Sequence, residues 1–135
     1  MGLDEIKEMI QDAGVGYLAT VEGNEPRVRP MMPGVFSDGT LYLATAKGSP
    51  KLSQIEKNSN CEMSFIDKRL SQVRVRGKAR IDNDIKKKEW LSNAVPMLRS
   101  YFPTPTDPNF VLLEFKPTKV LLIHIGEQEY TEVKI

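Results

Sequence analysis

Residues 72–81 read QVRVRGKARI, and the alternation in this stretch decides the fold class. Apolar or small residues stand at every second position, and polar or charged residues fill the positions between them. A period of two is typical of a β-strand that buries one face and exposes the other. We therefore expect one long strand here, in a sheet that covers a hydrophobic core.

Shorter β-rich segments lie on both sides of this strand. Their composition favours strands over residues 15–21, 27–32, 61–67, 110–115, 120–125 and 130–135. Residues 35–44 form a hairpin, because Asp38-Gly39 between two β-rich runs is a strong turn signal. Many short strands with few helices predict a mainly β (α+β) fold, built as a small antiparallel barrel.

Short helices are expected in three places. Apolar residues recur at helical spacing over residues 3–10. Ser49 is suited to be an N-cap and Pro50 to be the first helical residue, so a second helix begins there. Asp82 or Asn83 caps a third helix, which lies between the long strand and the C-terminal strands.

Composition bounds the function. The chain has 135 residues, a net charge of +1 and a single cysteine. This length predicts one domain over residues 1–135, and a charge near zero argues against a dedicated nucleic-acid binder. One cysteine excludes an internal disulfide and any multi-cysteine metal site, which favours a cytoplasmic location. Early acidic residues and the lack of a long apolar run predict no signal peptide and no membrane partner.

Residues 45–51, TAKGSPK, form the first candidate site. A helix start presents unpaired amide protons and the positive end of its dipole, which suits a phosphate. Thr45 and Ser49 add hydroxyl groups, and Lys47 and Lys51 add positive charge. The alternative is an ordinary capped helix with solvated lysines.

Residues 27–33, RVRPMMP, form the second candidate site. Two arginines precede an apolar strand, and Pro30 and Pro33 disturb its hydrogen-bond ladder, so the segment could frame a flat ligand. A guanidinium group is also a planar fork suited to phosphate. The alternative is an edge strand that proline and arginine protect against aggregation.

Four cations lie on the polar face of the long strand: Arg74, Arg76, Lys78 and Arg80. They could follow a nucleic-acid backbone. We favour the alternative of a solvated or dimer-facing surface balanced by nearby acids, because the net charge is close to zero.

Three single residues deserve an interpretation of their own. Cys61 is best explained as a buried, inert thiol, because no Cys–His motif surrounds it. His124 is best explained as a core or interface histidine. Trp90 packs on a helix, or stands near a flat ligand.

The order of motifs resembles that of the pyridoxamine 5′-phosphate oxidase-like split-barrel flavoproteins. The matching segments are GYLATV at 16–21, PRVRPM at 26–31, LYLATAKGSPK at 41–51 and QVRVRGKA at 72–79. The tail over residues 101–113 is similar to the short general-stress-protein branch of that family. The resemblance covers most of the chain, from about Gly14 to Ile125.

This resemblance implies a six-stranded Greek-key split barrel that forms a homodimer and binds FMN at the dimer interface. Within it, Ser49 and Lys51 match the residues that bind the FMN phosphate, and Gln72 matches a glutamine that reaches the flavin. Pro50 stands where the oxidase itself often has arginine, which weakens the implied phosphate clamp. The Trp and Arg segment that completes the vitamin oxidase's substrate site is also missing, so vitamin oxidase activity is not expected. The implied cofactor-binding residues are Arg29, Met31, Met32, Ala44, Thr45, Ser49, Lys51 and Gln72.

The resemblance leaves three functions open. The first is FMN-dependent reduction of a small molecule, with electrons from NAD(P)H or another donor. The second is a non-catalytic flavin-binding carrier, sensor or stress protein, and the third is a related barrel that binds deazaflavin or haem. A second-substrate pocket, if present, could involve Trp90, Arg99, Tyr101 or His124.

Overall fold

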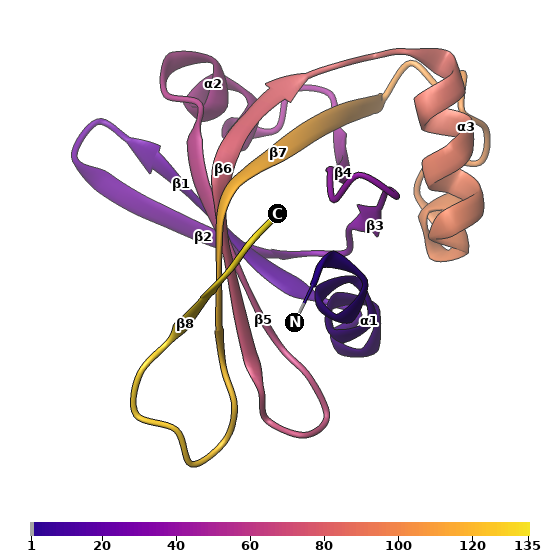
Figure 1. Ribbon diagram of the computed structural model, residues 1–135. Coiled ribbons are helices and arrows are strands. Elements are labelled where there is room, and N and C mark those ends of the chain that lie inside the picture. Colours follow the sequence, from indigo (N-terminus) through magenta and orange to yellow (C-terminus); the bar gives the residue numbers. More distant parts are fainter. Residues whose placement is uncertain (1) are drawn as a thin grey trace.

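The strand predicted from the alternating stretch, β6 (Gln72–Ile81), forms the centre of an antiparallel sheet. The computed structural model describes residues 2–135 (Figure 1). Strand order in the sheet is β2-β1-β5-β6-β7-β4-β3, and β8 pairs with β7. Six strands have six or more residues, and the sheet curls into the expected split barrel. The elements are α1 (Leu3–Ala13), β1 (Gly16–Glu22), β2 (Glu25–Met31), β3 (Gly34–Val35), β4 (Leu41–Ala46), α2 (Pro50–Lys57), β5 (Asn60–Ile66), β6 (Gln72–Ile81), α3 (Ile85–Ala94), the 3-10 helix η1 (Pro96–Ser100), β7 (Phe110–Ile123) and β8 (Thr131–Val133).

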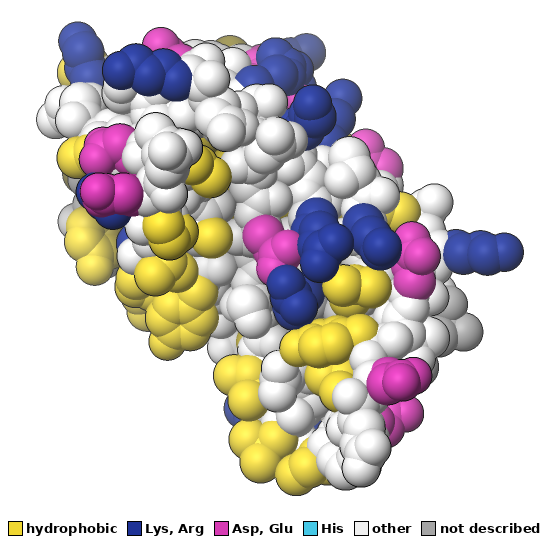
Figure 2. All heavy atoms as spheres, turned by 90° about the vertical axis from the view of Figure 1, so that its left-hand side faces the viewer, with side chains coloured by type: hydrophobic (Ala, Val, Ile, Leu, Met, Phe, Trp, Pro, Cys, Tyr) yellow, Lys and Arg dark blue, Asp and Glu magenta, His cyan; other side chains and the backbone are white. Residues whose placement is uncertain are grey.

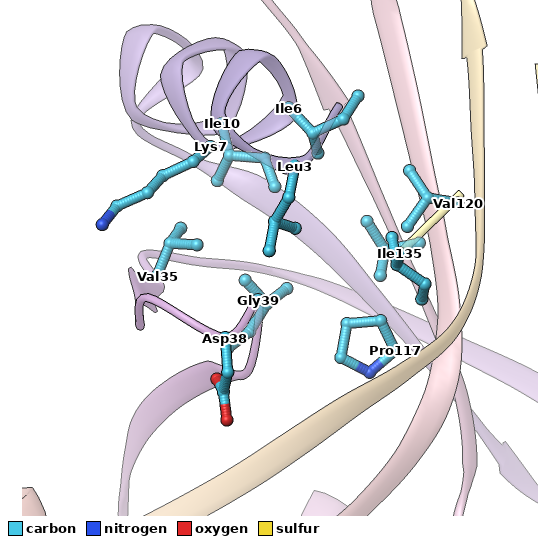
Figure 3. A pocket seen from close by; sticks show the side chains of 12 residues that line it. Leu3, Ile6, Lys7, Ile10, Val35, Asp38, Gly39, Pro117, Val120 and Ile135 are labelled. Atoms are coloured by element: carbon cyan, nitrogen blue, oxygen red, sulfur yellow. The ribbon is translucent and has the colours of Figure 1, made fainter. Parts of the chain in front are cut away.

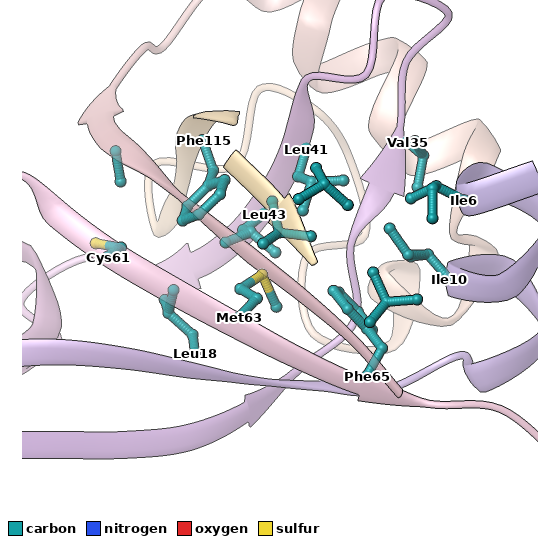
Figure 4. Packing of buried hydrophobic residues seen from close by; sticks show 14 of the residues in the cluster. Ile6, Ile10, Leu18, Val35, Leu41, Leu43, Cys61, Met63, Phe65 and Phe115 are labelled. Carbon is teal, nitrogen blue, oxygen red and sulfur yellow. The ribbon is translucent and has the colours of Figure 1, made fainter. Parts of the chain in front are cut away.

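The main hydrophobic core lies inside the curled sheet, where the alternating residues of each strand meet. Leu18, Leu43 and Met63 are fully buried there, and Phe65 and Phe115 fill the space around them (Figure 4). Helix α1 covers one end of this core with its apolar stripe. The period-two pattern of the sequence therefore has its physical cause in this shared interior.

A second, smaller core lies between the sheet and the segment formed by α3 and η1. Leu91 of α3, Leu98 of η1 and Phe102, which follows η1, pack with Phe110 and Leu112 of β7. The rings of Phe102 and Phe110 stack at 5.0 Å between centroids. This packing fixes η1 and the following residues beside the end of β4, which is where the candidate site lies.

The C-terminal strands differ from the prediction of separate strands at 110–115 and 120–125. The structure has one continuous strand, β7, which passes through Pro117. Pro117 pairs with Gly77, beside a register shift between Arg76 and Gly77. A proline has no amide proton to donate to the ladder, and a bulge in β7 itself, at Thr118, accommodates it without ending the pairing.

The cap of α3 and the ends of two strands also differ from the sequence prediction. The N-cap is Asp84, whose side chain accepts a hydrogen bond from the amide of Lys86. Asp82 instead bonds to Lys87, and Asn83 accepts from the amide of Leu112. The first strand of the hairpin shrinks to β3, and the last strand, β8, covers residues 131–133 only.

Cys61 lies in the core, as predicted for an inert thiol. Its side chain is 7% exposed. Burial raises the pKa of the thiol to about 11, so at neutral pH it stays protonated and weakly nucleophilic. Among residues 2–135, no helix combines the length and the apolar composition that crossing a bilayer demands.

Replacing Gly77 with alanine tests the fit between β6 and β7. A Cβ atom at this position would collide with the backbone carbonyl oxygen of Lys116, so one strand must move. We expect Gly77→Ala to lower the free energy of unfolding by about 3 kcal/mol, as measured by chemical denaturation. Gly2→Ala is the matched control, because a Cβ there meets no described atom within 4 Å; equal stability of the two variants would contradict this account.

Candidate functional site

Thr45, Ser49 and Lys51 come together where β4 ends and α2 begins. The ammonium group of Lys51 lies 2.7 Å from Thr45 Oγ1 and 2.7 Å from Ser49 Oγ, and donates to both. Ser49 occupies the N-cap position and Pro50 the first turn, as predicted, but the Ser49 side chain makes no capping hydrogen bond. Its hydroxyl group faces Lys51 instead, which gathers two hydroxyls and one cation at a helix start.

Arg29 reaches the same region from β2. Its guanidinium donates to the carbonyl oxygen of Leu18 at 3.1 Å, to Thr20 Oγ1 at 2.8 Å and to Gln54 Oε1 at 3.0 Å. The sequence reasoning missed Thr20 and Gln54. Two signals could have revealed them: Thr20 lies two residues after Leu18 on one strand face, and Gln54 lies three residues after Lys51 on α2.

Burial destabilises the charge on both cations of this site. It lowers the pKa of Arg29 below its usual value. It also lowers the pKa of Lys51, and the positive charge of Arg29 lowers that pKa further. Within the described residues 2–135, neither cation pairs with a carboxylate. Two neighbouring, partly buried cations without a counter-charge are suited to hold an anion.

A hollow of about 440 Å³ opens beside Lys51. This volume is in the range typical of small-molecule sites. Its wall contains five of the eight residues that the resemblance implies: Met31, Met32, Ala44, Thr45 and Lys51. The remaining lining residues are Val15, Pro30, Ala46, Leu98, Tyr101 and Phe102. The candidate site therefore has a cationic end and an apolar body.

Gln72 lies away from this hollow within one copy of the chain. Thr45 pairs with Val111 of β7, whereas Gln72 pairs with Ile123, at the other end of the same strand. These positions on β7 are about 40 Å apart along the strand. The side-chain oxygen of Gln72 accepts a hydrogen bond of 2.9 Å from the Tyr130 hydroxyl.

Of the four residues suggested for a second-substrate pocket, only Tyr101 lines the hollow. Trp90 packs edge-on against Phe36 and Tyr42. Arg99 donates to Asn93. His124 lies in a different hollow, with its Nδ1 3.0 Å from the Ser71 hydroxyl. No cluster of three or more metal-ligating side chains occurs within residues 2–135.

The basic stripe on β6 is interleaved with acids. Arg74 and Arg76 both pair with Glu62, at 2.6 and 2.7 Å. Arg80 pairs with the buried carboxylate of Glu114 at 3.1 Å. The acids that a balanced strand surface requires are therefore present.

A third hollow, of about 210 Å³, lies between α1 and the end of the barrel (Figure 3). Its walls are mostly aliphatic, with Leu3, Ile10 and Val120 among them, and its charged lining residues are Lys7 and Asp38. Because one cation there is matched by one acid, this hollow offers no excess positive charge comparable to that beside Lys51.

Comparison with known proteins agrees with the motif order. The sequence over residues 3–124 matches the family of pyridoxamine 5′-phosphate oxidase. General stress protein 26 of Bacillus subtilis (strain 168) is 36% identical over 143 residues, which cover 95% of each chain. The crystal structure of a NimC/NimA family protein from Clostridium acetobutylicum has a TM-score of 0.83 at 29% identity, and covers 98% of this chain and 91% of that one.

More distant structures share the fold alone. An FMN-binding protein from Nostoc punctiforme, related to pyridoxamine 5′-phosphate oxidase, has a TM-score of 0.69 at 20% identity over 96% of this chain and 86% of its own. A haem-binding protein from Mycobacterium smegmatis has a TM-score of 0.79 at 14% identity over 96% of this chain and 57% of its own. The family match over residues 3–124 and the 36% identical relative show that this chain belongs to the pyridoxamine 5′-phosphate oxidase family.

Proposed function

We propose that this protein binds FMN and uses it to reduce a small molecule. The observation that carries the proposal is the pair Arg29 and Lys51, two partly buried cations with no carboxylate partner among residues 2–135. Lys51 lines one end of an apolar hollow, and Arg29 lies close enough to lower the pKa of Lys51, as a phosphorylated, mostly apolar ligand requires.

The residues present fit the parts of FMN. A phosphate group carries up to two negative charges near neutral pH, which Arg29 and Lys51 would match in number. Thr45 and Ser49 would add hydroxyl hydrogen bonds to it. Met31 and Met32 would lie along the flat ring, because thioether side chains adapt well to aromatic surfaces. When bound, FMN supplies the hydride and electron transfer that protein side chains do not.

A histidine-ligated haem fits these residues less well than a flavin. Haem iron needs an axial ligand, and histidine is a frequent choice. The chain has a single histidine, His124, which lines a different hollow from the one beside Lys51. A deazaflavin with a phosphate tail would use the same cations, and the binding experiment below includes it as an outcome.

An exposed apolar face suggests that two copies associate. On the side of the molecule shown in Figure 2, hydrophobic side chains gather in patches between basic and acidic groups. Tyr17 is 52% exposed, Val28 68% and Ile66 48%. Tyr17 pairs with Pro30 of β2 and with Ser64 of β5, so Val28 and Ile66 share its outward side. We infer that a second copy covers this face.

Gln72 connects this face to the site. It pairs with Ile66, so it lies on the same outer side of the sheet. Pro30 belongs both to this face and to the wall of the hollow. Within one copy, the hollow has no Gln72 beside it. In a homodimer formed through this face, Gln72 of the partner subunit would be able to reach the hollow.

The apolar body of the hollow indicates the kind of substrate. Lys51 is its charged lining residue, and the part of the wall beyond it consists of residues such as Val15, Leu98 and Phe102. Tyr101, 71% exposed, stands on the same wall. This arrangement suits a flat, uncharged electrophile that stacks above the flavin ring.

We infer a cytoplasmic location, and NADH or NADPH as electron donor. The single cysteine makes no disulfide, which is usual in a reducing compartment. Both nucleotides are the general hydride donors of flavin chemistry.

Binding of FMN compared with riboflavin tests the phosphate site. We expect the wild type to bind FMN much more tightly than riboflavin, and the double variant Arg29→Ala/Lys51→Ala to lose FMN affinity roughly a hundredfold or more, because charged hydrogen bonds are lost. Quenching of flavin fluorescence measures both affinities. Lys57→Ala, at the far end of α2, is the control; equal loss there, or preferential uptake of a deazaflavin or haem, would contradict the assignment.

Charge placed on the exposed apolar face tests the homodimer. We expect the wild type to have twice the 15.3 kDa mass of one chain in light scattering, and Val28→Glu to be monomeric, because burying an unpaired carboxylate is costly. The monomer should also bind FMN weakly. Asn24→Glu, in the exposed turn between β1 and β2, should leave the mass unchanged, and a monomeric wild type would overturn the proposal.

Bleaching of the bound flavin separates catalysis from carriage. We expect NADH or NADPH to bleach the absorption of the FMN-loaded protein, and an uncharged aromatic nitro compound to restore it, because the apolar hollow admits such acceptors. Absorption spectra recorded without oxygen follow both steps. FMN that stays bound but does not respond to either reagent would instead identify a non-catalytic flavin carrier or sensor.

A further inference from the structure

Gln54 lies between the Arg29 guanidinium and the carboxylate of Glu22. Its Oε1 atom accepts from Arg29 at 3.0 Å and from the Thr20 hydroxyl at 2.6 Å. Its Nε2 atom donates to Glu22 at 3.3 Å. The residue is 5% exposed, although it stands on a surface helix. A buried amide that bonds on both sides is held in one orientation.

The acceptors around Arg29 are neutral. They are the backbone carbonyl of Leu18, the hydroxyl of Thr20 and the amide oxygen of Gln54. The hydroxyl hydrogen of Thr20 is directed to Gln54, which leaves the lone pairs of Thr20 Oγ1 for Arg29. Three neutral acceptors fix the direction of the guanidinium without cancelling its charge.

The carboxylate of Glu22 is held by other partners. One of its oxygens lies 3.1 Å from Arg27, on the exposed side of the hairpin, and the other accepts from Gln54. A carboxylate in direct contact with Arg29 would form an ion pair and close the site to other anions. Among residues 2–135, no carboxylate raises the pKa of Arg29, which agrees with its being separated from them.

We propose that Gln54 determines the preference of this site for phosphorylated ligands. Its uncharged amide holds Arg29 in place, keeps Glu22 at a distance and leaves the guanidinium charge for a phosphate. The inference rests on the proposed binding of FMN. In that function, Gln54 would set the selectivity between FMN and riboflavin, and it would do so without contacting the flavin ring.

The isosteric change Gln54→Glu tests the role of the neutral amide. An introduced carboxylate keeps the shape and both acceptor contacts, and its negative charge pairs with Arg29, but it loses the donor contact to Glu22 and faces that carboxylate. We expect FMN affinity to fall roughly tenfold to a hundredfold, as for loss of one charged contact, while riboflavin affinity stays within about twofold. The midpoint of thermal unfolding without ligand shows whether the variant folds. A purely structural role predicts equal effects on the two ligands.

Gln54→Met is the matched variant, because it has similar length and no charge. It removes the hydrogen bonds but adds no acid, so we expect its loss of FMN affinity to be clearly smaller than that of Gln54→Glu. Equal losses in the two variants would overturn the charge-based role. Thr20→Val provides a further measurement if Gln54→Glu does not fold: it should weaken FMN binding and leave riboflavin binding unchanged.

Inorganic phosphate separates failure of this inference from failure of the proposed function. If the wild type binds FMN and Gln54→Glu keeps the same ratio of FMN to riboflavin affinity, the role of Gln54 is wrong and the function stands. If no flavin binds, but phosphate raises the unfolding temperature of the wild type and not of Gln54→Glu, the function is wrong and the role of Gln54 stands. If neither flavin nor phosphate binds, both are wrong.

Discussion

The pairing of β6 with β7 is the constraint on which the other features depend. The ladder runs from Gln72 opposite Ile123 to Ile81 opposite Leu113, and it continues past Pro117 because Gly77 allows close approach. The N-terminal half of β7 then aligns β4, whose end carries Thr45. One uninterrupted strand thus fixes both where the cationic hollow forms and how far Gln72 lies from it.

The distribution of counter-charges separates structural cations from the cations of the site. On the outer sheet, Arg74, Arg76 and Arg80 each have a carboxylate partner. Arg29 and Lys51 are less exposed than a solvated cation, yet their partners are hydroxyls, a carbonyl and an amide. Paired surface charges contribute little net stability. Charges that are buried without a counter-charge lower stability. A protein retains such charges where they bind a ligand.

The sequence predicted the fold class because period-two alternation and turn chemistry are local properties. It also predicted the helix start at Ser49 and the gathering of Thr45, Ser49 and Lys51, which are close in the chain. It missed the continuity of β7, because a proline fits inside a strand only where the opposite residue leaves room for it. Gly77 does so because it has no side chain. It missed Thr20 and Gln54, because their contacts with Arg29 join three segments distant in sequence. Gln72 was implied by resemblance alone, and its distance from Lys51 emerged only with the register.

The hollow beside Lys51 and Gln72 lie at opposite ends of β7, and this separation has a genetic consequence. In the proposed homodimer every site draws on two chains, with Lys51 from one and Gln72 from the other. A chain with a defective Lys51 therefore impairs the site to which it supplies Lys51, and a chain with a defective Gln72 impairs the other site, the one that holds the partner's Lys51. When two chains with different defects assemble, one of the two sites receives both defects and the other receives none. Two inactive alleles of this protein would then complement each other within one molecule.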